Sequence, residues 1–181
     1  TGTLTEGNTI YTSSTDAWGG TGSTIGLTTS KWYWEVQLNA NAGGHFFGVI
    51  DETANVNDNP HQRTGSTFFY SAGAMYKDGS SDSGSHGTFG ATDICGIALN
   101  LDDNEITIYK NGSAIVTDFA LSTTNNTLFP WVMGYNNGSD ILKVNFGGCP
   151  PFSLSSAAND ENGYGNFEYA PPSGFLALCT K

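Results

Sequence analysis

The sequence predicts an all-β protein built as an antiparallel sandwich, and two observations support this prediction. The first is composition: the 181 residues include 24 Gly and 6 Pro, whereas charged residues that favour helices are scarce, with five Lys, one Arg and six Glu. The second is a series of short apolar segments separated by clusters of turn residues. Aromatic residues make up 13% of the chain, which is enough to fill a core and argues against disorder.

The clearest strand in the sequence covers residues 31–38. Apolar and more polar residues alternate along it, which is typical of a strand with one face on a core and the other face more polar. The segment before it, residues 1–30, is rich in Thr, Gly and Ser, and we expect short strands and loops there. The apolar face of the strand carries Trp32, Trp34, Val36 and Leu38, and the opposite face carries Lys31, Tyr33, Glu35 and Gln37.

Turn signals divide the rest of the chain into further strands. Asn111-Gly112 between two apolar runs predicts a hairpin, because both residues tolerate positive φ. Residues 51–64 are polar and contain Asn59-Pro60, and residues 77–87 are rich in Gly, Ser and Asp, so both segments are predicted loops. The remaining strands are expected at 45–50, 66–70, 74–76, 94–101, 105–110, 114–119, 128–134 and 140–146.

The charge pattern excludes two classes of partner. The formal net charge is −11, and the six basic residues are spread along the chain, so we expect no basic surface for the phosphates of nucleic acid. The same scarcity argues against anionic membrane surfaces. No apolar run is long enough to cross a membrane, so no membrane insertion is expected.

The cysteines are Cys95, Cys149 and Cys179, an odd number at wide spacing. This spacing is neither a zinc pattern nor a disulfide framework, and buried thiols are the favoured interpretation. A bridge between Cys149 and Cys179 that closes the C-terminal segment is the alternative left open.

No constellation of catalytic residues is apparent. The strand that contains Glu35 lacks the alternating carboxylates with which jelly-roll glucanases place an acid and a nucleophile on one sugar. His45, His61 and His86 are well separated, and no Cys or His lies at metal-ligand spacing to them. We therefore expect a protein that is not an enzyme and that has no metal and no cofactor.

One loop is rich in oxygen ligands. Residues 51–59 include Asp51, Glu52 and Asp58 together with several Asn, and hard cations such as calcium prefer oxygen. The spacing does not fit an EF-hand, so solvated loop side chains are the favoured interpretation and a calcium site is the alternative.

The ordered segments resemble the SPRY domain family over about residues 31–153. The resemblance implies a bent two-sheet antiparallel β-sandwich, related to concanavalin-like jelly rolls, whose members recognise ligands without catalysis. We accordingly divide the chain into a SPRY-like sandwich at residues 1–154 and a C-terminal extension at 155–181 that packs on the sandwich or lies beyond it. The matching segments are Lys31–Val36, Phe46–Ile50, Tyr76-Lys77-Asp78-Gly79, Asp93–Leu101, Glu105–Gly112, Leu128-Phe129-Pro130, Val144–Gly147 and Pro151-Phe152.

The C-terminal extension carries a second, shorter resemblance. Residues 163–180 are similar to the segment that follows SPRY-like domains in bacteriophage and marine viral proteins, some of which are tail-associated. This similarity implies a structural or tail-associated phage protein and a location in the virion.

Candidate binding residues lie near predicted loops. Partly exposed aromatic side chains at loop ends grip ligands at little entropic cost. In SPRY domains that bind short peptides, the ligand sits on end loops, and the resemblance places these loops at 76–78 and 135–137. For each residue, the alternative is that it only closes a turn, while Trp32, Trp34, Phe46, Ile108 and Phe146 are assigned to the core. The candidate set is Trp18, Tyr70, Tyr76, Asp78, Tyr135, Asn136 and Asn137.

Three functional hypotheses follow. The first is a non-enzymatic recognition module that binds a protein segment or a surface glycan through these loops. The second is a glycan-cleaving enzyme on the related jelly-roll fold, which requires two carboxyl groups converging in one cleft. The third is a purely structural domain whose residues 155–181 dock on a neighbouring virion subunit.

Overall fold

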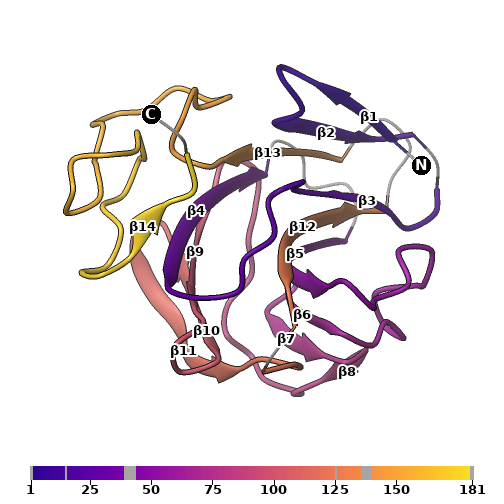
Figure 1. Cartoon of the computed structure of the whole chain (residues 1–181). Helices are drawn as coiled ribbons and strands as arrows, with labels where there is room; N and C mark the ends of the chain where they lie inside the picture. Colours follow the sequence, from indigo (N-terminus) through magenta and orange to yellow (C-terminus); the bar gives the residue numbers. More distant parts are fainter. Residues whose placement is uncertain (1, 15, 39–43, 125, 136–139, 180–181) are drawn as a thin grey trace.

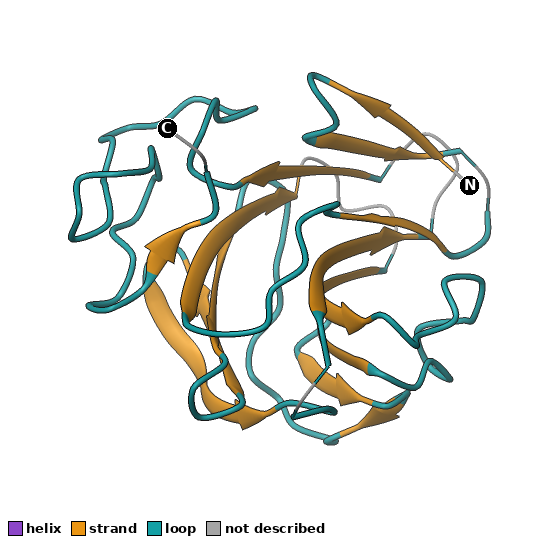
Figure 2. Cartoon of the chain, in the orientation of Figure 1, coloured by secondary structure: helices purple, strands orange, loops and turns teal. Residues whose placement is uncertain are grey.

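The computed structural model describes residues 2–14, 16–38, 44–124, 126–135 and 140–179. Within these residues the chain forms strands and loops and no helix (Figure 1; Figure 2). Two sheets face each other, and the predicted all-β sandwich is confirmed. The described residues accordingly include no helix with the length and apolarity needed to cross a membrane.

The first sheet, sheet A, has the strand order β1-β2-β13-β4-β9-β10-β11, and a short strand, β14, also pairs with β4. All of these pairs are antiparallel except that of β14 with β4. The strands are β1 (Gly2–Thr5), β2 (Ile10–Ser13), β4 (Lys31–Leu38), β9 (Ile94–Asn100), β10 (Glu105–Lys110), β11 (Ser113–Ala120), β13 (Ile141–Asn145) and β14 (Leu176–Ala177).

The second sheet, sheet B, has the order β3-β12-β5-β6-β7-β8 and is antiparallel throughout. The strands expected between residues 31 and 146 form in the two sheets with ends that differ by at most one residue from the prediction. Two short strands were not expected: β8 lies in a predicted loop and β14 in the C-terminal extension. The strands of sheet B are β3 (Gly19–Gly22), β5 (His45–Asp51), β6 (Ser66–Tyr70), β7 (Ala74–Lys77), β8 (Ser80–Ser81) and β12 (Leu128–Gly134).

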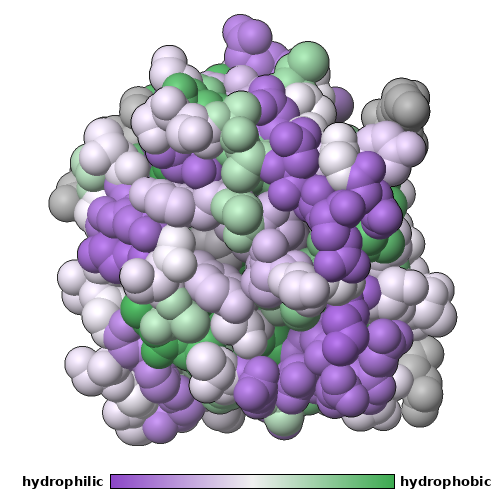
Figure 3. Space-filling view, turned by 90° about the vertical axis from the view of Figure 1, so that its left-hand side faces the viewer, coloured by the Kyte–Doolittle hydropathy of each residue, from purple (hydrophilic) through white to green (hydrophobic). Residues whose placement is uncertain are grey.

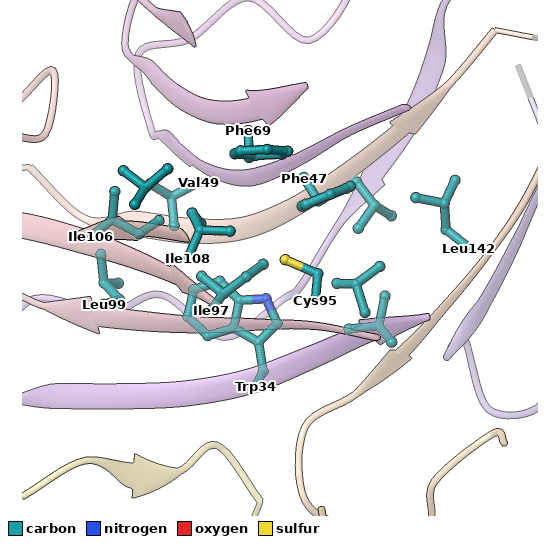
Figure 4. Close-up of a cluster of buried hydrophobic side chains, with 14 of the residues drawn as sticks. Trp34, Phe47, Val49, Phe69, Cys95, Ile97, Leu99, Ile106, Ile108 and Leu142 are labelled. Atoms are coloured by element: carbon teal, nitrogen blue, oxygen red, sulfur yellow. The ribbon is translucent and has the colours of Figure 1, made fainter. Parts of the chain in front are cut away.

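The main core fills the space between the sheets (Figure 4). Trp34 from β4 and Ile108 from β10 are buried there as predicted, and Trp32 and Phe146 pack against it while partly buried. Phe46 is also buried, but it belongs to a separate cluster on the outer face of sheet B. Burying each large apolar side chain contributes about 1.5–3 kcal/mol relative to leaving it in water.

The C-terminal tail covers part of the outer face of sheet A, which lies beside it in Figure 1. The face of β4 that was predicted to be more polar is therefore buried at two positions, with Tyr33 1% and Glu35 0% exposed. The ring of Phe167 packs edge-on against Tyr33 at a centroid distance of 5.1 Å. With Ala98 and Ala177, these two residues form a second buried cluster.

Buried carboxylates hold the tail in place. Glu35 accepts hydrogen bonds from the backbone N–H groups of Glu168 (3.0 Å) and Tyr169 (2.9 Å) and from the side-chain amide of Asn145 (3.2 Å). Burial nevertheless raises the pKa of Glu35 above its ordinary value of 4.5, because desolvation outweighs these bonds.

A second carboxylate lies within the tail. Asp160 is buried and accepts a hydrogen bond from the backbone N–H of Ala177 in β14 at 3.0 Å, so it ties the start of the tail to its end. Figure 3 views the molecule from the left-hand side of Figure 1, on which the tail lies. Most of this face is hydrophilic or neutral, with scattered apolar patches.

The three thiols have different surroundings and are unpaired in the structure. Cys95 is buried in the main core, as expected. The expectation of a buried thiol is wrong for Cys149, which is exposed in the turn after β13, and Cys179 is only partly buried at the end of the tail.

Candidate binding site

Sheet B carries a group of aromatic rings on its outer face, which we call the aromatic cluster. Strand alternation creates it: Phe47 and Phe69 point into the main core, so their neighbours Phe46 and Tyr70 point outward. Phe46 and Tyr70 lie directly opposite each other in the register of β5 and β6, and their rings stack with centroids 4.6 Å apart. The aromatic cluster comprises Trp18, Phe46, His61, Tyr70, Tyr76 and Tyr135.

Phe46 is the centre of the aromatic cluster and is fully buried. The rings of Trp18, His61 and Tyr76 each lie 5.1 Å from it, centroid to centroid, in edge-to-face arrangements. Tyr135 in turn lies 5.1 Å from Trp18. Aromatic pairs at such distances contribute about 0.5–1.5 kcal/mol each beyond the area that they bury, so the rings hold one another in fixed positions.

The rim of the aromatic cluster is accessible. Tyr135 is 42% exposed, His61 is exposed, and the other rim residues are half-buried. Partial burial against the neighbouring rings lowers the pKa of the His61 imidazole from its ordinary value of 6.5. A ligand that covers these rings meets rigid apolar area together with phenol and imidazole groups that form hydrogen bonds.

The structure brings the four predicted aromatic residues together but not all seven candidates. Asp78 stands apart from the rings: its carboxylate accepts a hydrogen bond from the backbone N–H of Gly65 at 2.8 Å, and its φ of 51° belongs to a tight turn. It therefore fixes the end of the loop that carries His61. Asn136 and Asn137, which follow Tyr135 in the sequence, lie outside the described residues.

The loop between β5 and β6 supplies His61, which sequence reasoning did not select. Arg63 pins this loop: it is fully buried, and its Nη2 donates to the carbonyl oxygens of Val56 (2.9 Å) and Asp58 (2.6 Å). Its guanidinium also lies 5.5 Å from the centroid of the Trp131 ring. Desolvation lowers the pKa of Arg63, and these contacts offset part of the cost of burying its charge.

Two acidic residues of the same loop, Asp51 and Asp58, accept hydrogen bonds from protein donors. Asp51 was expected to be solvated, but it is buried. Its Oδ1 accepts hydrogen bonds from the backbone N–H of Thr53 at 2.8 Å and from the hydroxyl of Thr53 at 2.7 Å. Its Oδ2 accepts one from the side-chain amide of Asn126 at 2.9 Å. Across the described part of the chain, no group of three or more His, Cys, Asp or Glu is placed to hold a metal ion.

Ser71, His45 and Asp140 form a buried polar network that the sequence did not predict. Ser71 Oγ lies 3.5 Å from His45 Nδ1, and His45 Nε2 lies 3.3 Å from Asp140 Oδ1 without good hydrogen-bond alignment. The residue types are those of a serine hydrolase, but Ser71 is only 7% exposed. Its hydroxyl oxygen already accepts a hydrogen bond from the backbone N–H of His45 at 3.1 Å. Asp140 accepts the backbone N–H of Tyr135 at 2.8 Å, so we interpret the network as support for the aromatic cluster.

A separate groove of about 400 Å³ opens between the sheets and is lined by Leu4, Ile25, Trp34 and Phe146, among others. None of its lining residues is Asp or Glu. Two further hollows are lined by one carboxylate each, Asp93 and Glu6. None of the three therefore holds the converging carboxyl pair that a glycan-cleaving enzyme requires.

Comparison with known proteins gives a family and a fold. The sequence matches the SPRY domain family over residues 31–148. The SPRY domain of human HERC1 has a similar structure, with a TM-score of 0.65 and 22% sequence identity over 83% of this chain and 93% of that chain. A second human SPRY domain has a TM-score of 0.60 and 16% identity over 78% of this chain and 92% of that chain. No curated protein sequence matches the chain.

Proposed function

The chain belongs to the SPRY domain family, whose members are generally protein-interaction modules rather than enzymes, and on this premise we propose that its aromatic cluster binds a peptide segment of a partner protein. One observation carries this proposal. Trp18, Tyr70 and Tyr135 come from three separate segments of the chain and converge with Tyr76 on one accessible surface around the buried Phe46.

The chemistry of the surface favours a particular kind of peptide. Rigid rings stack on aromatic or apolar side chains, and their faces attract Lys and Arg through cation–π interactions. The net charge of −11 repels acidic segments. We therefore infer a neutral or basic segment with at least one large side chain that lies across Tyr70, Tyr76 and Tyr135.

A glycan is the second ligand class that the same rings suit, because the apolar faces of sugar rings stack on aromatic side chains. No described contact favours a glycan over a peptide, so the glycan is an outcome of the test below. The phage or virion setting stays a prediction from the C-terminal extension, since the similar structures named above are human SPRY domains.

Peptides selected from a random phage-displayed library on the unmodified chain provide the probe for a test. Their Kd values would be measured for the unmodified chain, for the Tyr76→Ala/Tyr135→Ala double variant, and for Tyr164→Ala. Tyr164 is a matched control, because it is 43% exposed, against 42% for Tyr135, but lies in the tail.

We expect the double variant to weaken binding at least about tenfold, because truncating an aromatic hot-spot residue at an interface costs about 2 kcal/mol or more. The control variant should bind like the unmodified chain. Equal affinity of the unmodified chain and the double variant rejects this site. Binding on a glycan array that the double variant abolishes, without any selected peptide, would keep the site and replace the peptide by a carbohydrate.

A further inference from the structure

Two strands share one edge of β4 and end facing each other. β13 is antiparallel to β4 and pairs with it as far as Asn145, which lies opposite Glu35. β14 is parallel to β4 and pairs with Trp32 and Tyr33. Because the two strands approach from opposite directions, the chain leaves both of them at the gap between these positions. The residues that follow β13 and β14 are thus brought together by the register of the sheet.

Distances confirm that these two segments touch. The position that a Cβ would take on Gly147 lies 3.1 Å from the Cβ of Ala177, and that on Gly148 lies 4.0 Å from the Cβ of Cys179. Cys149 is the next residue, and consecutive Cα atoms are about 3.8 Å apart. Disulfides usually join residues whose Cα atoms are about 4.4–6.8 Å apart, and the contact between Gly148 and Cys179 places the exposed turn at Cys149 beside the end of the tail.

We propose that Cys149 and Cys179 form a disulfide bond that fastens the C-terminal tail to sheet A. Cys149 is exposed and Cys179 is partly buried, so both thiols are open to an oxidant. Cys95 does not compete with them, because it is fully buried between the sheets. Its desolvation also raises the pKa of its thiol, which keeps it out of the reactive thiolate form.

The oxidant for this step is a low-molecular-weight disulfide. The thiolate of the exposed Cys149 attacks one of its sulfur atoms, forms a mixed disulfide and releases one thiol. The thiolate of Cys179 then attacks the sulfur of Cys149 and releases the second thiol. The two cysteines lose two electrons and two protons, and the external disulfide is reduced to two thiols.

The bond would change how firmly the tail is held. In the reduced chain, the tail is kept on sheet A by noncovalent contacts such as the packing of Phe167 on Tyr33 and the hydrogen bonds to Glu35. Oxidation closes a covalent loop from residue 149 to 179 around these contacts. Closing a loop in the unfolded chain stabilises the folded state, so the oxidised protein should be the more stable form.

The test treats the full chain with oxidised glutathione, blocks remaining thiols, digests the protein and analyses it by mass spectrometry. We expect a monomer in which the peptides of Cys149 and Cys179 are linked, one remaining free thiol on denaturation, and a Tm several degrees higher that returns to its starting value with dithiothreitol. Cys95→Ser should give the same linked peptide and the same rise in Tm, with no free thiol left on denaturation. Cys149→Ser and Cys179→Ser should give neither the linked peptide nor the rise in Tm.

Three results would overturn the proposal. They are glutathione mixed disulfides that persist on both cysteines, disulfide-linked dimers as the main product, or a bridge to Cys95. A linked peptide without any rise in Tm would contradict the claim that the bond fastens the tail.

Discussion

At the scale of single residues, Glu35 is a buried carboxylate at the contact between the tail and sheet A. Its carboxylate is fully buried and accepts hydrogen bonds from the backbone N–H groups of two successive tail residues, Glu168 and Tyr169. These bonds favour the charged form, whereas desolvation favours the neutral form and has the larger effect. Glu35 is therefore a point at which pH acts on the attachment of the tail.

The raised pKa of Glu35 predicts a pH dependence of stability with a definite sign. Well below pH 4.5 the side chain is protonated in both the folded and the unfolded chain. As the pH rises from 4.5 through the folded-state pKa, the unfolded chain releases a proton that the folded chain retains, so the contribution of Glu35 to stability falls.

Urea unfolding of the unmodified chain and of Glu35→Gln at a series of pH values between about 4 and 8 measures this effect. The free energy of unfolding of the unmodified chain minus that of the variant should decrease as the pH rises, because the other titrating groups are common to both. A difference that is constant, or that increases with pH, would show that Glu35 does not titrate in this way.

At the scale of elements, the C-terminal tail acts as a third layer on sheet A. Phe167 is fully buried against Tyr33, and Leu178 reaches the main core.

Phe167→Ala should lower the free energy of unfolding by about 3–5 kcal/mol, since it leaves a cavity under the tail. Val56→Ala, at a side chain that is 53% exposed, is the control and should change it by less than about 0.5 kcal/mol. Chemical denaturation checks both values, and a loss below about 1 kcal/mol for Phe167→Ala would argue against a packed tail.

Local signals made the strands predictable, whereas the tail contacts are long-range. Period-two alternation at residues 31–38 and the Asn111-Gly112 turn depend on neighbours in the sequence, and β4 and the β10–β11 hairpin formed accordingly. The burial of Glu35 depends on backbone groups more than 130 residues later in the chain. No pattern in the neighbouring sequence indicates a partner so far along the chain, so the second face of β4 was expected to be the more polar one.

The aromatic cluster was predictable in part for the same reason. Tyr70 and Tyr135 lie at the ends of expected strands, which pointed to accessible rings near loops. The sequence could not predict that Phe46 points outward, because its strand is apolar on both faces and shows no alternation. His61 lies in a polar loop, and only the fold shows that it packs on Phe46.

At the scale of the whole molecule, the two outer faces of the sandwich differ. The outer face of sheet A is covered in part by the tail, which buries Tyr33 and Glu35. The outer face of sheet B carries the aromatic cluster, whose rim is accessible. The tail of the chain thus covers part of one outer face, and we propose that the other face presents its aromatic side chains to a partner.

The most direct test of recognition through sheet B is an NMR titration of the ¹⁵N-labelled chain with a peptide selected from the random library. We predict that the largest amide shift changes cluster at Trp18, Tyr70, Tyr76 and Tyr135. Changes concentrated instead at the groove near Leu4 and Ile25, or on the tail around Tyr164, would contradict the account.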